Sequence, residues 1–546
     1  MKPMTVAYFS AEYAIADDMP IYAGGLGVLA ADMLLEAGAQ GRSFAAVGLV
    51  YHMAFTGDDP DQRPMKERLE ANGFALATEP GGKQITVSVL VAGRRVALRA
   101  WVKHWGDTQL ILLDANLHEN LPMDRAICDR LYASDLKLQL AQEICLGFGG
   151  VAMLDVLGVK PDVYHLNEGH TALAGLAVAL MEAHEQSERT LSEAVAAVKH
   201  KLVGTKHTIL PGAGILLDWH SVTGQMSAVL ESYGVSIEEL KEIAGLINGD
   251  YSDTKLMIKL TRLASGVSEI HVAEELSVHK NSQLITITNG IFRPRWASPI
   301  WGDQPLELSD AEIWDKHCQG RRKLLEMANE HTDDALDPDA LTVVWARRMA
   351  AYKRPELLVT DLKRLAEVAS AVGRPIQFVV AGRANPADAI GVELMKRVVM
   401  AAQSEQFKHR LAYLPAYNPA TAKLLVQGAD VWLNTPIRGY EACGTSGMKA
   451  SLNGAVQFST SDGWIDEIEL PRIGWELPVK HAAKSLYDLL EAEIAPKFYD
   501  RGDDGLPHEW IKLMRANIEL ISKQFTATRM LDDYYSKLYA PAVDRA

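Results

Sequence analysis

Nine consecutive residues at positions 441–449 combine side chains and backbone that could hold an anion: Glu-Ala-Cys-Gly-Thr-Ser-Gly-Met-Lys. The apolar run at 429–434 before them predicts a buried strand, and a helix is expected over 448–452. Where a glycine turn joins a strand to a helix, backbone N–H groups and the positive helix end point at a ligand. Glu441 enters this turn and Lys449 leaves it. An amine there could bind phosphate as a point charge or form a Schiff base.

A second set of charges follows another predicted strand, at 341–345. Arg347, Arg348, Lys353 and Arg354 place four cations within eight residues. They would repel one another unless an anion lay among them. In an arbitrary chain such a run is most often a solvated basic edge. Because a buried strand leads straight into it here, we predict an anion site.

A glycine-rich turn lies in the segment 21–30, Ile-Tyr-Ala-Gly-Gly-Leu-Gly-Val-Leu-Ala, after the first predicted strand. Its glycines allow the backbone to approach an anion, and a helix expected from about Leu26 would point its positive end there. Taken alone, such a turn is a structural turn as often as a phosphate site.

Two further strand ends carry histidines. Glu168 and His170 could ligate a metal, but no third ligand has suitable spacing, so we expect no metal site. Such a pair is more often a hydrogen-bonded part of a loop. His207 follows another strand, and a single histidine is usually structural.

Short apolar runs alternate with helical patterns along the chain, which is typical of parallel α/β folding. Strands are expected in a first half at 5–9, 109–113, 162–166, 202–205 and 284–288, and in a second half at 341–345, 376–381, 411–414, 431–434 and 455–459. One helix is expected to start at Pro355 and to stop at Gly373. We predict two facing Rossmann-like domains with ligands at the carboxyl ends of their strands.

The expected domains are residues 1–290, residues 291–508, and a C-terminal helical tract, 509–546, that packs partly back on the first domain.

With 546 residues and 48% hydrophobic content, the chain can bury large cores. Its net charge of -15 argues against general affinity for nucleic acid or anionic membranes. The four cysteines show no CxxC spacing, so reduced thiols in a cytoplasmic protein are expected. No signal peptide or membrane-spanning run is evident.

The segment 441–449 resembles the pyridoxal-phosphate segment of the α-glucan (glycogen, starch, maltodextrin) phosphorylases. The glycine turn, the segments around His170 and His207, Asn289-Gly290, and the basic cluster resemble further motifs of that family. Cys443 stands where serine is common, and Ser446-Gly447 is similar to the shorter bacterial and archaeal branch. Because the chain starts almost at its first strand, we expect it to lack the N-terminal extension that carries phosphorylation and nucleotide control in animal-type members.

The resemblance implies a GT-B type fold with the active site in the interdomain cleft, and phosphorolysis of α-1,4-glucan to α-glucose 1-phosphate with retention. It implies pyridoxal 5′-phosphate as a Schiff base on Lys449, with the cofactor's phosphate as its working part. By match, the catalytic residues are Arg347, Arg348, Lys353, His207 and Glu441. The cofactor-binding residues are Lys449, Gly24, Gly25, Gly444, Thr445, Ser446, Tyr417 and Trp296. The substrate-binding residues are Asn289, Glu168, His170, Tyr352 and Cys443.

The expected partners are glycogen or maltodextrin, inorganic phosphate and glucose 1-phosphate, in a cytoplasmic homodimer that binds neither nucleic acid nor membrane. Retaining glycosidases need two carboxylates about 5 Å apart, and no motif brings such a pair together, so phosphate is expected to carry the chemistry. A nucleotide-sugar glucosyltransferase of the same architecture, similar to glycogen synthase, is the alternative enzyme. A non-catalytic glucan-binding protein is a further alternative. Lys449 and the basic cluster argue against both.

Overall fold

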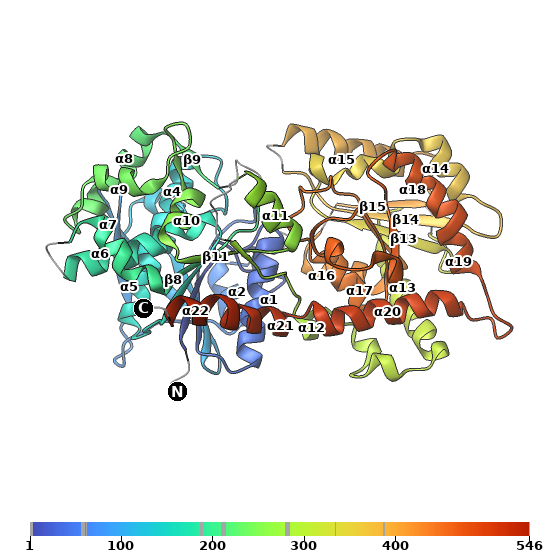
Figure 1. Cartoon of the computed structure of the whole chain (residues 1–546), viewed down its shortest axis with the longest axis horizontal. Helices are drawn as coiled ribbons and strands as arrows, with labels where there is room; N and C mark the ends of the chain where they lie inside the picture. Colours follow the sequence, from blue (N-terminus) through green and yellow to red (C-terminus); the bar gives the residue numbers. More distant parts are fainter. Residues whose placement is uncertain are drawn as a thin grey trace. The chain divides into compact units, whose positions relative to one another are not determined.

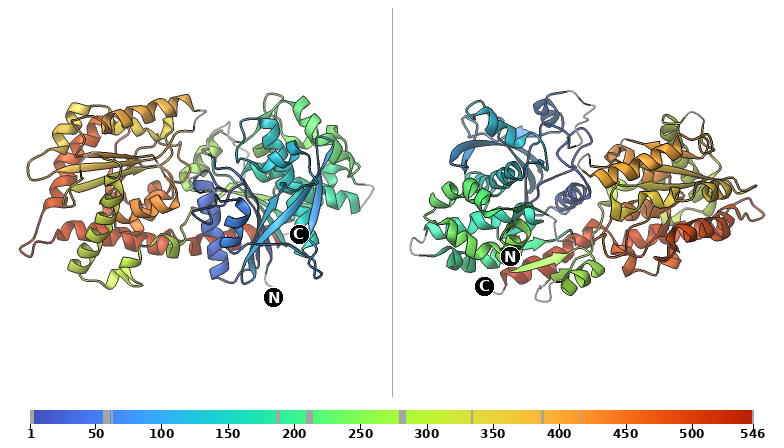
Figure 2. Two further views of the ribbon diagram at one scale, coloured as in Figure 1. Left: turned by 180° about the vertical axis from the view of Figure 1, so that it is seen from behind. Right: turned by 90° about the horizontal axis from the view of Figure 1, so that it is seen from above.

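The protein is described by a computed structural model that covers residues 4–55, 61, 63–185, 189–208, 214–278, 284–332, 335–385, 388–415 and 417–544. The chain forms two compact units. Unit 1 comprises Met1–Val267, Glu275–Ile287 and Met530–Ala546, and unit 2 comprises Ser268–Glu274 and Thr288–Arg529. Helices cover both faces of the central sheet in each unit (Figures 1 and 2). Within the described residues, no helix is both long enough and apolar enough to cross a membrane.

Unit 2 is built on a six-stranded sheet in the order β15-β14-β13-β16-β17-β18, in which every pairing is parallel. In chain order the strands are β13 Leu341–Ala346, β14 Ile376–Ala381, β15 Leu411–Leu414, β16 Val431–Asn434, β17 Val456–Ser459 and β18 Gly474–Glu476. The first five are almost wholly buried apolar runs, as expected of strands covered on both faces. The strand order reverses between β13 and β16, and this is the point where ligands bind in Rossmann-like sheets.

Unit 1 contains a ten-stranded sheet in the order β12-β11-β8-β7-β1-β2-β6-β5-β3, with β4 paired to β5. Its strands are β1 Val6–Phe9, β2 Phe44–Leu49, β3 Ala75–Leu76, β4 Thr86–Val91, β5 Arg94–Trp105, β6 Thr108–Asp114, β7 Val163–Asn167, β8 Leu202–Thr205, β11 Leu263–Gly266 and β12 Leu284–Thr286. The strands from β12 to β6 are parallel, whereas β3, β4 and β5 form an antiparallel extension. Here the order reverses between β1 and β7.

Helices of ordinary length connect these strands. In unit 1 they include α1 Gly25–Ala39, α4 Leu136–Ile144, α6 Ala172–Glu185, α8 Trp219–Glu231 and α10 Asp253–Leu260. In unit 2 they include α13 Asp310–Asn329, α14 Leu362–Ala369, α15 Ala389–Ala402, α16 Pro419–Gly428, α17 Ser446–Leu452, α18 Ala482–Leu489 and α20 His508–Gln524. Figure 1 shows α14 and α15 on one face of the unit 2 sheet and α17 and α20 on the other.

Two sequence expectations are corrected. The single helix expected from Pro355 is broken into a 3-10 segment, Pro355–Val359, and α14. The break occurs because the carboxylate of Asp361 accepts the backbone N–H of Arg364 and so begins a new helix. The longer strands β2, β4, β5, β11 and β18 were not predicted, and neither were the two-residue strands β3, β9 (Leu216–Leu217) and β10 (Tyr251–Ser252).

Candidate active site

The basic cluster and the glutamate meet at the reversal point of the unit 2 sheet. Arg347 and Lys353 follow β13, and Glu441 follows β16. Arg347 Nη2 lies 3.0 Å from Glu441 Oε1, and Lys353 Nζ lies 3.1 Å from the same oxygen. The three side chains are only 7%, 11% and 12% exposed. A buried carboxylate therefore holds two buried cations together.

This cluster contains two cations, Arg347 and Lys353, but only one carboxylate, Glu441. Burial alone would raise the pKa of Glu441, but the cations of Arg347 and Lys353 outweigh it and lower the pKa to about 2. Glu441 is thus ionised at neutral pH. Arg347 still has its Nε and Nη1 groups buried without a hydrogen-bond partner among the described residues. Because buried donors are costly when unpaired, this one spare positive charge and its two N–H groups indicate a site for an anion.

Hydrogen bonds from neighbouring side chains fix the backbone around Glu441. The carboxylate of Asp462 accepts the N–H groups of Glu441 and Gly463, both at 3.0 Å. Burial, reinforced by the charge of Glu441 and opposed by these N–H bonds, raises the pKa of Asp462 to about 6. Asn289 Nδ2 donates to the carbonyl of Cys443 at 3.2 Å. Gly444 allows close packing, because a Cβ there would lie 2.8 Å from Glu441 Oε1.

Lys449 is nearly buried, at 7% exposure, on helix α17. Its Nζ lies 4.0 Å from the centroid of the Trp296 ring. Asn453 ties the two together by donating from Nδ2 to the carbonyls of both Trp296 and Lys449. Gly447 is required beside them, because a Cβ there would come within 2.9 Å of Gln457 Oε1. Unit 2 therefore offers a sheltered amine against an aromatic face.

The other predicted residues of unit 2 differ in how far they are buried. Arg348 is exposed and forms no ion pair with any described residue. The ring of Tyr352 lies 5.1 Å from Lys353 Nζ. Burial raises the pKa of Tyr417 to about 12, opposed by the nearby charge of Arg347. The Oδ1 of Asn289 is buried without a partner among the described residues, so it can still accept a hydrogen bond.

The glycine turn of unit 1 lies at the reversal point of that sheet, between β1 and α1. Glu12 Oε2 accepts the N–H groups of Ala23 at 2.6 Å and Gly24 at 3.0 Å. Tyr132, which has a φ of 53°, donates its hydroxyl to Glu12 Oε1 at 2.9 Å. A Cβ on Gly24 or Gly25 would meet no atom within 4 Å, so one side of the turn is open. The N–H of Gly24 is therefore bonded to Glu12, whereas Gly24 and Gly25 were both predicted to lie against an anionic ligand.

The second unit 1 cluster follows β7 and β8. Glu168 adopts a φ of 77° and accepts the backbone N–H of His207 at 2.7 Å. His207 Nε2 donates to Asn167 Oδ1 at 2.6 Å. Burial lowers the pKa of His170 to about 4, and its Nδ1 has no partner in the described part of the chain. These side chains form a hydrogen-bonding surface suited to hydroxyl groups.

Sequence reasoning missed several residues that hold the site together. Glu12, Tyr132 and Asp462 are single polar residues outside the recognised motifs, and only their burial and bonding identify them. Among the described residues, no group of three or more His, Cys, Asp or Glu side chains is placed to hold a metal ion.

The chain is similar in sequence to several known proteins. A family model described as carbohydrate phosphorylase matches residues 309–476. The chain is 32% identical to a glycogen phosphorylase of Aquifex aeolicus, over 98% of this chain and 86% of that protein. It is 34% identical to a glycogen phosphorylase of Mycobacterium tuberculosis, over 99% of this chain and 71% of that protein. It is 31% identical to a maltodextrin phosphorylase of Thermococcus litoralis, again over 99% and 71%.

Proposed function

Because the chain belongs to the carbohydrate phosphorylase family, we propose that it is an α-1,4-glucan phosphorylase of the GT-B type. It transfers a terminal glucosyl unit of glycogen or maltodextrin to inorganic phosphate, reversibly and with retention. The observation that carries this proposal is the buried Arg347–Glu441–Lys353 cluster, in which Nε and Nη1 of Arg347 have no partner among the described residues.

Phosphate binding is the role of the cations. Arg347 Nε and Nη1 supply two fixed donors, and Lys353 supplies a point charge. A guanidinium pairs with phosphate through two parallel N–H bonds, which orients the anion as well as holding it. The exposed Arg348 can add a third cation, because it forms no ion pair within the described part of the chain.

The glutamate acts on the sugar. With a pKa of about 2, Glu441 cannot serve as a general acid at neutral pH. It remains an anion, which stabilises positive charge that develops on a glucosyl ring during transfer. Asn289 Oδ1 and the side chains of His170 and His207 are proposed to bind sugar hydroxyls. The proton for the departing glucan is proposed to come from the substrate phosphate.

The chemistry of the residues around Lys449 in unit 2 suits pyridoxal 5′-phosphate. The nearly buried amine lies over Trp296, and the turn of Gly444, Thr445 and Ser446 adjoins it. We propose that Lys449 holds the cofactor, with Trp296, Tyr417, this turn, Gly24 and Gly25 as further binding residues. When bound, pyridoxal phosphate would supply through its phosphate group a proton donor and acceptor for the substrate phosphate.

The function is tested by measuring glucose 1-phosphate released from maltoheptaose with and without inorganic phosphate. We expect release only with phosphate, and chain extension when glucose 1-phosphate is the donor. Arg347→Ala should lower the rate by about 10²–10³, as loss of one oriented electrostatic contact does. The matched control is Arg374→Ala, which removes an exposed guanidinium of the same unit. Release without phosphate, or activity only with a nucleotide sugar, would show that the proposal is wrong.

The cofactor is tested separately. After borohydride reduction, the peptide that contains Lys449 should carry the mass of reduced pyridoxal phosphate. Lys449→Ala should lose both the added mass and the activity, whereas the exposed control Lys363→Ala should keep both. Full phosphorolysis by a protein without added mass on this peptide would refute the cofactor assignment.

A further inference from the structure

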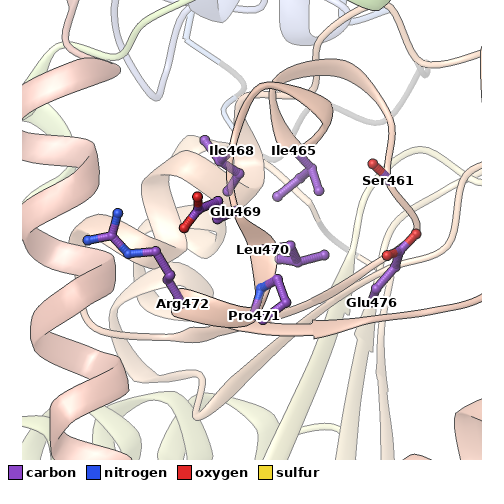
Figure 3. Close-up of a pocket in the computed structure, with 8 residues that line it drawn as sticks. All are labelled: Ser461, Ile465, Ile468, Glu469, Leu470, Pro471, Arg472 and Glu476. Atoms are coloured by element: carbon purple, nitrogen blue, oxygen red, sulfur yellow. The ribbon is translucent and has the colours of Figure 1, made fainter.

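The segment between β17 and β18 contains a partly buried glutamate, Glu467, that lies outside the recognised motifs. The segment includes two 3-10 turns, Gly463–Glu467 and Leu470–Arg472. Figure 3 shows Ile465 and Leu470 lining a hollow of about 450 Å³ in this part of unit 2. Both side chains are buried, at 2% and 4% exposure. Apolar contacts therefore anchor the backbone on each side of Glu467.

The carboxylate of Glu467 binds two residues from distant parts of the chain. Its Oε1 accepts the backbone N–H of Glu269 at 2.9 Å. The hydroxyl of Thr288 donates to the same carboxylate and lies 2.9 Å from both oxygens. Both oxygens are therefore engaged by the protein itself, so Glu467 can act on a substrate only through these neighbours.

Thr288 directly precedes Asn289, whose amide is proposed above to bind a sugar hydroxyl. The backbone of these two residues is bound by one guanidinium. Arg529 donates from Nη1 to the carbonyl of Thr288 at 2.6 Å and from Nη2 to the carbonyl of Asn289 at 3.0 Å. With its carbonyl on Arg529 and its hydroxyl on Glu467, the residue before Asn289 is fixed at both backbone and side chain.

The amide of Asn289 has one end bound to the protein and one end available. Nδ2 donates to the carbonyl of Cys443 at 3.2 Å, whereas Oδ1 is buried without a partner among the described residues. Because an amide group is planar, the bond at Nδ2 also sets the direction in which Oδ1 points. A shift of the backbone at Asn289 would therefore misdirect the oxygen that can accept a hydrogen bond from a sugar.

The second residue bound by Glu467 adjoins the same loop. Ser268 directly precedes Glu269 and donates its hydroxyl to the carbonyl of Ala442. Ala442 is the residue after Glu441. The single carboxylate of Glu467 thus holds neighbours of both side chains that bind the loop after Glu441.

We propose that Glu467 is a positioning residue for sugar binding: by holding Thr288 it fixes the direction of the Asn289 amide. The inference rests on the proposed function. Without this carboxylate, the hydroxyl of Thr288 and the N–H of Glu269 lose their acceptor, and the backbone beside Asn289 can shift. A displacement of about 1 Å is enough to weaken an oriented contact.

The effect should distinguish the sugar from the phosphate. Arg347 and Lys353, the proposed phosphate ligands, are bound by Glu441. Within the described part of the chain, neither cation forms an ion pair or hydrogen bond with Glu467. Loss of Glu467 should therefore weaken the contact with the glucosyl unit and leave the phosphate contacts in place.

The test compares two variants of the full-length protein. Glu467→Leu keeps most of the side-chain volume but removes both acceptor oxygens, whereas Glu467→Gln keeps one. In Glu467→Leu, KM for maltoheptaose at saturating phosphate should rise about tenfold, as loss of about one hydrogen bond gives. KM for phosphate and kcat should stay within about twofold, because uniform binding alone is lost. Glu467→Gln should restore most of the affinity for maltoheptaose.

A second variant tests the route through Thr288. Thr288→Val removes the hydroxyl and should raise KM for maltoheptaose as Glu467→Leu does. Combining the two changes should add nothing further, because both break one contact. The matched control is Glu469→Leu in the same segment. Glu469 is exposed and its side chain forms no hydrogen bond or ion pair with a described residue; Figure 3 shows it on the same side of the hollow as Arg472.

A thermal melt verifies that each variant folds, and hydrogen–deuterium exchange gives a readout that needs no turnover. The peptides that contain Asn289 and Cys443 should exchange faster in Glu467→Leu than in wild type and should not change in Glu469→Leu. Exchange that is unchanged in Glu467→Leu would overturn the proposal.

Kinetics can overturn the proposal independently. An unchanged KM for maltoheptaose in Glu467→Leu and Thr288→Val would do so. Equal rises in both KM values, or a fall in kcat alone, would also do so, because they would indicate general damage to the site. If the wild-type protein releases no glucose 1-phosphate, the proposed function fails, and the exchange rates then decide by themselves whether Glu467 positions Asn289.

Discussion

Glu441→Gln tests whether the carboxylate is the counter-charge of the cation cluster. Glutamine keeps the size of the side chain but removes its charge, which leaves the buried side chains of Arg347 and Lys353 without an anion. The pKa of Glu441 falls from 4.5 to about 2 in the folded protein. At 1.36 kcal/mol per unit, this shift corresponds to about 3 kcal/mol of stability. The cost of breaking a buried ion pair is of the same size.

The pH dependence of this stability follows from the direction of the shift. A depressed pKa stabilises the folded state above the ordinary value of 4.5, and the stabilisation is lost as pH falls toward about 2. For a unit of roughly 250 residues, about 3 kcal/mol lowers the melting midpoint by about 6–12 °C. We expect this decrease at pH 7 in Glu441→Gln, and a smaller difference between variant and wild type as the pH approaches 2.

The assay is a thermal melt followed by circular dichroism, with Glu326→Gln as the exposed control. Inorganic phosphate provides a second readout, because an added anion can replace the missing carboxylate between the cations. Phosphate should therefore raise the midpoint of Glu441→Gln more than that of wild type. An unchanged midpoint in the variant, or equal stabilisation of both proteins by phosphate, would refute the reasoning.

Three further variants probe other parts of unit 2. Asp430→Asn removes the buried partner of Arg321 and His317, at 2.8 and 2.7 Å, and should cost about 3–5 kcal/mol; a denaturation midpoint equal to wild type would contradict this. Asp462→Asn removes a carboxyl whose pKa is raised to about 6, so wild type should lose stability relative to the variant as pH rises from about 4 to about 6. Parallel pH profiles of the melting midpoint would exclude that role. Lys449→Ala should abolish the pyridoxal-phosphate absorbance of the purified protein, and an unchanged spectrum would place the cofactor elsewhere.

The strands that carry the site residues could be predicted from the sequence, because each is a local run of apolar residues. The runs ending at Ala346, Asn434 and Asn167 are short, apolar and followed directly by polar residues. The strands that were missed have weaker signals. β2, Phe-Ala-Ala-Val-Gly-Leu, is rich in alanine and glycine, and β18 is only three residues long. Their place in the sheets is fixed by pairing with distant strands, which no local pattern reports.

The site was predictable to the extent that its residues lie in motifs. The motifs identified Arg347, Lys353, Glu441 and Lys449, but they could not give their partners. That Glu441 binds both cations is a contact across about ninety residues of sequence, and it depends on β13 and β16 being neighbours. The role of Asp462 could not be predicted for the same reason, because its contact with Glu441 also joins residues that are distant in the sequence.

The ionisation of Glu441 separates two kinds of glycosyl chemistry. A retaining glycosidase requires one carboxyl with a raised pKa as the acid and a second carboxylate as the nucleophile. Here the pKa of Glu441 is lowered by two cations, and the carboxylate of Asp462 is occupied by the backbone N–H groups of Glu441 and Gly463. Glu441 therefore cannot protonate a leaving glucan, and Asp462, although its pKa is raised to about 6, is engaged in holding the backbone of Glu441 and Gly463. The same cations that hold Glu441 ionised attract a phosphate, which can both carry a proton and accept the glucosyl unit. The charge pattern of unit 2 thus favours phosphorolysis over hydrolysis.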